Sequence, residues 1–192
     1  MGGSANILQK KDLKKVLQWV GNRRRHHRDT AIILLSFKAG LRACEIAGLD
    51  WSMVTTSSGA LGRSLAINRS IAKNGRARRV PLHPQLRTAL GTLNISLGKP
   101  RTGPVIESQR GGNLTPGSVV NWFSALYSQV GLQGCSSHSG RRTFITKSAR
   151  MLARVGGSLR DVQELAGHSA LTTTERYIEG DRRAQRRLVR LL

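Results

Sequence analysis

Residues 167–181, GHSALTTTERYIEGD, contain one of the two tyrosines of the chain, Tyr177, nine residues after His168. A phenol is a poor nucleophile at neutral pH because its unperturbed pKa is about 10. If Tyr177 performs chemistry, other groups must activate the phenol and stabilise what it forms. We therefore expect cations and proton donors from other segments. The alternative interpretation is that Tyr177 is a core aromatic residue.

Cationic residues are abundant along the chain. Its 192 residues include 32 Lys+Arg and 10 Asp+Glu, which gives a formal net charge of +22. This excess indicates a polyanionic partner, most simply nucleic acid. A generic nucleic-acid-packing protein has the same composition, so charge alone does not distinguish an enzyme from a packing protein.

Three further segments of the chain have cationic side chains at positions where a helix or a turn is expected to begin or end. Arg42 follows a glycine stop and has Glu45 three residues on, Lys73 precedes an Asn-Gly turn, and His138 lies three residues before Arg141. Taken singly, these are a surface ion pair of little worth, a solvated turn lysine and a solvated basic helix face.

Together with residues 167–181, these segments resemble one family in order and in local pattern, the tyrosine recombinases, also called phage integrases. The four boxes read GLRACEIAGLDW, AKNGRARRVPL, HSGRRTF and GHSALTTTERY. The resemblance covers about residues 8–180. Four boxes in the correct order are a far more specific signal than any single box.

The resemblance implies DNA cleavage by transesterification. Arg42 and Arg141 would clamp the phosphate oxygens with planar guanidinium donors. Tyr177 would attack the phosphorus and form a link to the DNA 3′ end, leaving a free 5′ hydroxyl that later attacks back. No metal and no nucleotide cofactor is expected, because the covalent link conserves the bond energy.

The resemblance also assigns the supporting groups. Lys73 would protonate the leaving hydroxyl, and His138 would accept the proton of the tyrosine or bind the phosphate. His168 would donate to the phosphate. Glu45 would hold Arg42 in place.

The chain departs from the family in two respects. Family members usually have a further N-terminal helical domain, which we expect to be absent because the first box begins near residue 40. Surplus arginines would then replace part of the lost DNA clamp. The candidates for DNA binding are Arg23, Arg24, Arg25, Arg28, Arg76, Arg78, Arg79 and Arg142, the last at a position where the family often has histidine.

The elements expected to position these residues are mainly helices. Apolar spacing predicts helices over residues 10–20, 30–39 and 83–97, and others that begin near Thr115–Pro116, His138 and Ser158. Tyr127 lies beside an apolar stripe and is interpreted as packing. Thr172 and Glu175 read as a capping box, which would put Tyr177 in the second turn of a short helix.

A small antiparallel sheet completes the expected fold. Leu65 and Ile67 precede the Asn74-Gly75 turn signal and Val80 and Leu82 follow it, so Lys73 should lie at or near a hairpin tip. The fold class is therefore mainly α with a small antiparallel β-sheet (α+β), the tyrosine recombinase catalytic-domain fold. Residues 1–180 would form this domain and residues 181–192 a basic amphipathic tail, which docks either on its own domain or on a neighbouring subunit.

The sequence also restricts location and partners. No apolar stretch spans a membrane, no signal peptide is evident, and Cys44 and Cys135 form no CxxC pair, so an intracellular, DNA-associated protein is expected. The predicted partner is double-stranded DNA, with a homotetramer assembled on it. The alternatives are a non-catalytic DNA-binding regulator, a packing protein, a type IB topoisomerase and a protelomerase-like enzyme.

Overall fold

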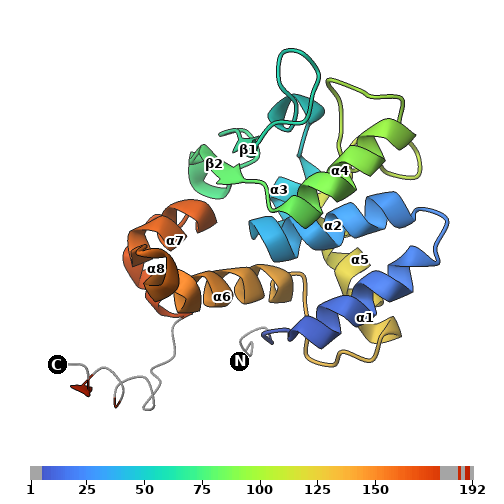
Figure 1. Cartoon of the computed structure of the whole chain (residues 1–192). Coiled ribbons are helices and arrows are strands. Elements are labelled where there is room, and N and C mark those ends of the chain that lie inside the picture. Colours follow the sequence, from blue (N-terminus) through green and yellow to red (C-terminus); the bar gives the residue numbers. More distant parts are fainter. Residues whose placement is uncertain (1–5, 178–185, 187–188, 191–192) are drawn as a thin grey trace.

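The computed structural model describes residues 6–177 together with residues 186, 189 and 190. The expected tail over residues 181–192 therefore lies almost wholly outside the described residues, and its docking stays a prediction. The described chain is mostly helical with one two-stranded sheet, which confirms the predicted fold class (Figure 1). No helix in this part of the chain is long and apolar enough to cross a membrane.

The elements follow one another in a simple order. The helices are α1 (Lys10–Gly21), α2 (His26–Ala39), α3 (Ala43–Ala47), α4 (Pro84–Ser96), α5 (Pro116–Gln129), α6 (Ser139–Val155), α7 (Leu159–Ala166) and α8 (Leu171–Glu175). The strands are β1 (Ser64–Ile67) and β2 (Arg78–Pro81), and single 3-10 turns occur at η1 (Trp51–Met53) and η2 (Lys73–Gly75).

Helix α2 is the centre of the main core and packs against α1, α4 and α6. Its AIILL run is buried on all sides, as expected for a helix covered by others. It ends at Gly40, whose left-handed backbone (φ 64°) is the conformation that glycine adopts without strain. Tyr127 of α5 is buried and stacks on Phe123, as predicted.

The sheet pairs β1 and β2 antiparallel, with Leu65 opposite Val80. The strands are confirmed, and the turn signal at Asn74-Gly75 falls in η2, between them. Residues 68–77 form a longer connection that includes η2, and Lys73 lies in it. The reason is tertiary, because Ala72 is buried and Ile71 packs against the main core, which draws the connection inward.

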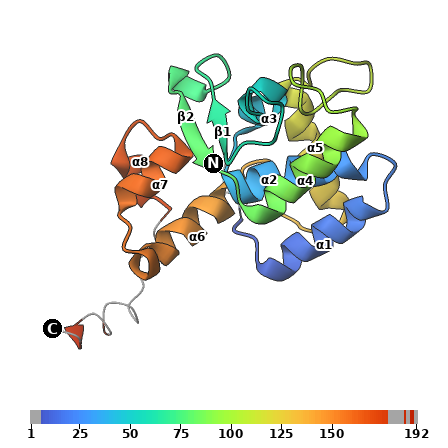
Figure 2. The same cartoon turned by 45° about the horizontal axis from the view of Figure 1, so that its top comes forward.

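Helices α6, α7 and α8 enclose a second, smaller core. It consists of Ile145, Val162 and Ala166, with Phe144, Leu152 and Tyr177 packed against it. Figures 1 and 2 show α6 running from the body of the molecule to α7 and α8 at one side. Tyr177 therefore belongs to the smaller core, apart from the main one.

The ends of α7 and α8 place the residues around Tyr177. The helix predicted to begin near Ser158 is α7, which starts with a capping box between Ser158 and Asp161 and ends at left-handed Gly167 (φ 65°). The predicted capping box of α8 is wrong, because Ala170 caps this helix and Thr172 lies inside it. Tyr177 follows the end of α8 and does not lie in its second turn. The early start allows Thr174 to contact His168 from within the helix, which a local pattern does not reveal.

Candidate active site

Arg141 is buried at the junction of three helices. It lies in the first turn of α6, and its guanidinium donates to the carbonyl oxygens of Gly40 (2.5 Å) and Ala166 (2.7 Å). These carbonyls close the C-terminal ends of α2 and α7, where the helix dipole favours a cation. Burial and the nearby charge of Arg42 lower the pKa of Arg141 to about 10, so it remains charged at neutral pH.

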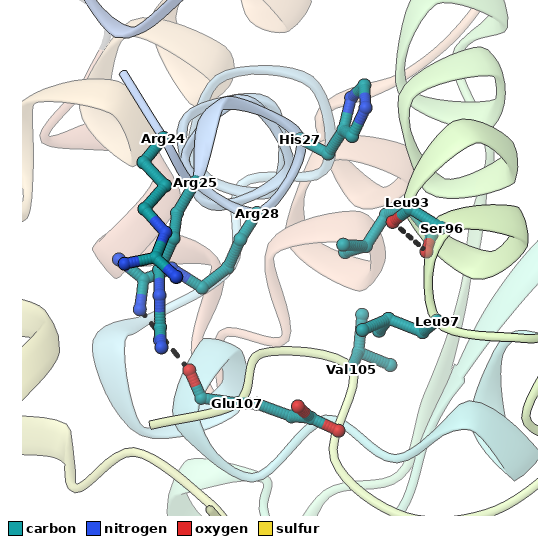
Figure 3. Close-up of a pocket in the computed structure, with 9 residues that line it drawn as sticks. All are labelled: Arg24, Arg25, His27, Arg28, Leu93, Ser96, Leu97, Val105 and Glu107. Carbon is teal, nitrogen blue, oxygen red and sulfur yellow. Dashed lines mark hydrogen bonds between the residues drawn. The ribbon is translucent and has the colours of Figure 1, made fainter. Parts of the chain in front are cut away.

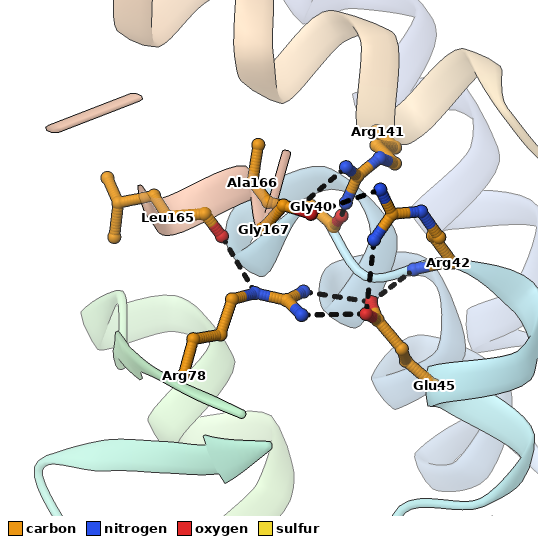
Figure 4. Close-up of polar contacts among 8 residues, drawn as sticks. All are labelled: Gly40, Arg42, Glu45, Arg78, Arg141, Leu165, Ala166 and Gly167. Atoms are coloured by element: carbon orange, nitrogen blue, oxygen red, sulfur yellow. Dashed lines mark hydrogen bonds and ion pairs between the residues drawn. The ribbon is translucent and has the colours of Figure 1, made fainter. Parts of the chain in front are cut away.

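Glu45 joins Arg42 to a second arginine, Arg78 (Figure 4). Arg42 caps α3, and Glu45 accepts from its backbone N–H (2.9 Å) and from its Nη1 (3.3 Å). Arg78 donates to both carboxylate oxygens, at 2.7 and 2.9 Å. Burial raises the pKa of Glu45, but the hydrogen bonds and charges of Arg78 and Arg42 outweigh it, so the net pKa lies below its ordinary value.

The sequence predicts that Arg78 contacts DNA phosphates at the surface. In the structure its side chain instead lies largely inside the molecule. Its side chain is only 7% exposed, and its Nε donates to the Leu165 carbonyl at 3.0 Å. Arg42 reaches the same segment through a 3.4 Å bond to the carbonyl of Gly167. The network thus ties β2 and α3 to the end of α7. Local sequence gives no signal for it, since Arg78 lies 33 positions from Glu45.

His168 is buried directly after α7 and lies beside Tyr177. The two rings are stacked at 5.6 Å between centroids with an interplanar angle of 21°. His168 Nδ1 is 2.9 Å from the hydroxyl of Thr174. Burial, followed by the charges of Arg141, Arg42 and Arg78, lowers the pKa of His168 to about 4. The imidazole is therefore neutral at physiological pH.

Tyr177 is half-buried and held by its backbone. Its N–H donates to the Thr174 carbonyl (3.0 Å), and its carbonyl accepts from the Thr146 hydroxyl (3.3 Å). The guanidinium carbon of Arg142 lies 5.6 Å from the centre of the Tyr177 ring, a cation–π geometry. The hydrogen bonds fix the backbone of Tyr177, and its ring has a cation and a neutral imidazole as neighbours.

His138 is the N-cap residue of α6, three residues before Arg141. Partial burial and the positive charges of Arg141, Lys73 and Arg42 lower its pKa. Lys73 itself is exposed on η2. The structure thus brings Arg42 from α3, His138 and Arg141 from α6, and His168 and Tyr177 around α8 to one region, and the charge of exposed Lys73 on η2 reaches His138.

A groove extends from this region between β2 and α7. Arg76, Arg79, Gln163 and His168 are among the residues that line it, and its volume is about 420 Å³. Arg160 also lines it and was not predicted from the sequence, where it is one exposed arginine of a basic chain. Arg76 and Arg79 give the groove a positive character next to His168, while Arg160 pairs with Glu164, which also lines it.

The other predicted DNA-binding arginines lie elsewhere. Arg24, Arg25 and Arg28 line a pocket of about 330 Å³ at the start of α2 (Figure 3). Arg23 lines an adjoining pocket. Helix α2 separates them from Gly40 by about 20 Å, given its length and a rise of about 1.5 Å per residue. Arg28 pairs closely with buried Asp29, at 2.7 Å. The structure thus does not bring this cluster to Tyr177.

The chemistry available at the site is oxyanion binding next to a phenol. Each guanidinium keeps N–H donors beyond those in the bonds described, and a neutral imidazole adds another. Among the described residues, no group of three or more His, Cys, Asp or Glu side chains is placed to hold a metal ion. The site is suited to an anion with several oxygens, held close to a tyrosine.

The sequence of this chain is similar to the sequences of known proteins. The model of the phage integrase family matches residues 6–183. Tyrosine recombinase XerC of Myxococcus xanthus is 32% identical over 182 residues, covering 90% of this chain and 54% of the relative. XerC of Rhodospirillum centenum is 30% identical over 166 residues, covering 85% of this chain and 44% of the relative. The chain thus spans about half the length of these curated relatives.

Solved structures share the fold at low sequence identity. XerA recombinase aligns with a TM-score of 0.72 at 21% identity, covering 97% of this chain and 65% of that one. The Tn1549 transposon integrase in complex with transposon right end DNA aligns with a TM-score of 0.74 at 17% identity, with the same coverages. XerH bound to its difH substrate aligns at 0.71 and 20% identity, covering 96% and 53%.

Proposed function

Because the chain belongs to the phage integrase family, we propose that it is the catalytic part of a site-specific DNA recombinase, with Tyr177 as the nucleophile. The observation that carries the proposal is the convergence of Arg42, Arg141 and His168 on the region of Tyr177. The family supplies the reaction class, DNA breaking and rejoining. The geometry supplies the residues that would perform it in this chain.

In the proposed cleavage step, the Tyr177 oxygen bonds to phosphorus and the bond from phosphorus to the 5′ oxygen breaks. The phenolic proton passes to His138, and Lys73 protonates the leaving 5′ oxygen. Arg42 and Arg141 stabilise the charge that builds on the non-bridging oxygens. Their positions are supported before substrate arrives, by Glu45 for Arg42 and by helix carbonyls for Arg141.

Rejoining is the reverse reaction with a different 5′ hydroxyl. The covalent 3′-phosphotyrosyl link conserves the bond energy, so the proposed cycle consumes no nucleotide. His168, neutral because of its low pKa, donates a ring N–H to the phosphate and does not act as an acid. Exchange between two DNA sites would need several subunits, and we propose a tetramer assembled on DNA.

Double-stranded DNA is the proposed substrate. The structural neighbours include an integrase bound to transposon DNA and XerH bound to difH. In this chain the groove lined by Arg76, Arg79 and Arg160 opens beside His168 and would accept the backbone that flanks the cleaved phosphate.

The test is covalent trapping with a matched pair of tyrosine variants. Protein is incubated with a pool of DNA fragments from its source and denatured with detergent, and protein-linked DNA is recovered and sequenced. Tyr177→Phe should abolish the link while DNA binding survives. Tyr127→Phe is the control, because the Tyr127 hydroxyl is buried with no hydrogen-bond partner among the described residues, so its loss should leave linking intact.

Two results would count against the proposal. Linked DNA that persists in Tyr177→Phe would assign the nucleophile elsewhere. Tight binding by the unaltered protein with no linked DNA from any fragment would favour a non-catalytic regulator that occupies recombination sites.

A further inference from the structure

We infer that Thr174 is a positioning residue that fixes the tautomer of His168, so that Nε2 carries the ring proton and donates it toward the phosphate. The inference deepens the proposed function and rests on it for the identity of the anion. Its structural basis is the contact of 2.9 Å between Thr174 Oγ1 and His168 Nδ1.

The direction of this hydrogen bond follows from the surroundings of the hydroxyl. Thr174 is 0% exposed, and within the described residues its hydroxyl has no hydrogen-bond partner other than His168 Nδ1. If Nδ1 donated to the hydroxyl, the proton of the hydroxyl would be buried without an acceptor in the described part of the chain, at a cost of about 1–3 kcal/mol. The hydroxyl therefore donates, and Nδ1 accepts.

A neutral imidazole carries one N–H, so a ring that accepts at Nδ1 must carry its proton at Nε2. The ring is neutral at physiological pH, because its pKa lies near 4. The opposite tautomer would present a lone pair at Nε2, which repels an anionic phosphate where a donor is required.

Other contacts keep the ring in this orientation. The backbone of His168 is tied to Gln163 in both directions, by His168 N–H to the Gln163 carbonyl (3.0 Å) and by Gln163 Nε2 to the His168 carbonyl (3.2 Å). One face of the ring is covered by Tyr177. Thr174 thus meets one edge of a fixed ring, and the Nε2 edge is left for the substrate.

The experiment combines a spectroscopic readout with a kinetic one. Protein labelled with nitrogen-15 at histidine is studied at pH 7 by two-bond nitrogen–proton correlation, which identifies the protonated ring nitrogen. His168→Gln identifies the signals of His168. The unaltered protein should show the Nε2–H form. Thr174→Val, similar in shape but without the hydroxyl, should show a mixture of the two tautomers.

The rate of covalent DNA linking should fall on the order of tenfold in Thr174→Val, as for the loss of about one hydrogen bond, with DNA affinity unchanged. Thr174→Ser restores the hydroxyl and should restore both readouts. Thr172→Val removes an exposed hydroxyl of the same helix and should change neither. Thermal unfolding of each variant checks that it is folded. If Thr174→Val does not fold, the tautomer seen in the unaltered protein and in Thr174→Ser still tests the inference.

The inference is overturned if Thr174→Val keeps the pure Nε2–H form, or if the unaltered protein shows Nδ1–H. The tautomer readout needs no DNA, so it is independent of the proposed function. If the tautomer shifts as expected but no variant links DNA, the role of Thr174 stands and the recombinase proposal fails.

Discussion

At the scale of single residues, Glu45 is a buried carboxylate shared by two guanidiniums. Its side chain is 0% exposed and accepts from Arg42 and Arg78. Glu45→Gln would leave two partly buried arginines without their counter-charge and close to Arg141. We expect the free energy of unfolding to fall by about 3–5 kcal/mol, as for other broken buried ion pairs. Urea denaturation measures this loss.

The chain offers a matched control for this substitution. Glu164 pairs with Arg160 at 3.0 Å, but its side chain is 66% exposed. Glu164→Gln should cost less than about 1 kcal/mol, because solvent screens an exposed pair. Equal effects of the two substitutions would show that the Glu45 network contributes no more than a surface pair.

The sequence indicates the residues that bear reactive groups better than those that hold them. The boxes name Arg42, Arg141, His168 and Tyr177, and the structure brings these to one region. The partner of Arg141 is a pair of backbone carbonyls, which no sequence pattern encodes. Thr174 likewise reads as one of three consecutive threonines, and only the fold shows that its hydroxyl meets His168.

At the scale of elements, α6 crosses α2 at a glycine. A Cβ on Gly140 would lie 2.8 Å from Phe37 Cδ2 and closer still to Ser36 Oγ. Gly140→Ala would therefore force α6 away from α2 and displace Arg141, the next residue. We expect a loss of about 1–3 kcal/mol in unfolding free energy, typical of overpacking, together with slower DNA linking. Denaturation and trapping assays measure the two effects.

Gly117 provides the comparison, since it is likewise the second residue of its helix. The only neighbour of its added Cβ among the atoms described is Thr115 Oγ1, at 3.8 Å. Gly117→Ala should be neutral or stabilising by about 0.5–1 kcal/mol, because alanine favours helix. A Gly140→Ala variant as stable as Gly117→Ala would contradict the close contact between α6 and α2.

Elements with strong local signals were predictable, and those shaped by tertiary contacts were not. Ser158 with Asp161 and the glycine stops at Gly40 and Gly167 define helix ends through local hydrogen bonds and backbone freedom. Helix α8 begins after Ala170, which has no side-chain cap hydrogen bond, so no local cap signal marks its start. The connection over residues 68–77 depends on Ile71 reaching the main core, and no local pattern reports that.

At the scale of the whole molecule, the net charge of +22 predicts DNA affinity that falls steeply with salt, because phosphate contacts release counterions. Substitution of Arg24 and Arg25 tests whether the arginine cluster at the start of α2 contacts DNA. If both contact phosphates, replacing them with glutamine should reduce the slope of log affinity against log salt by about two. Titrations at several salt concentrations measure the slope.

The control for this experiment is the pair Lys11→Gln and Lys14→Gln, exposed residues of α1 outside the predicted interface. These substitutions lower the net charge equally. Equal changes of slope in both pairs would indicate a general effect of charge, and an unchanged slope for Arg24 and Arg25 would remove this cluster from the interface.

The division of the molecule into two cores has a thermodynamic consequence. Tyr177 belongs to the smaller core of α6–α8, while Arg42 and Arg78 extend from the body and donate to carbonyls at the end of α7. A phosphate bound between Tyr177 and these arginines would add bonds on both sides of that boundary. Closure of the α7–α8 unit and occupancy of the site would then be linked equilibria, each favouring the other by the same free energy. The correct substrate would thus complete the assembly of the catalyst that cleaves it, and an empty site would be the part of the molecule that opens most easily.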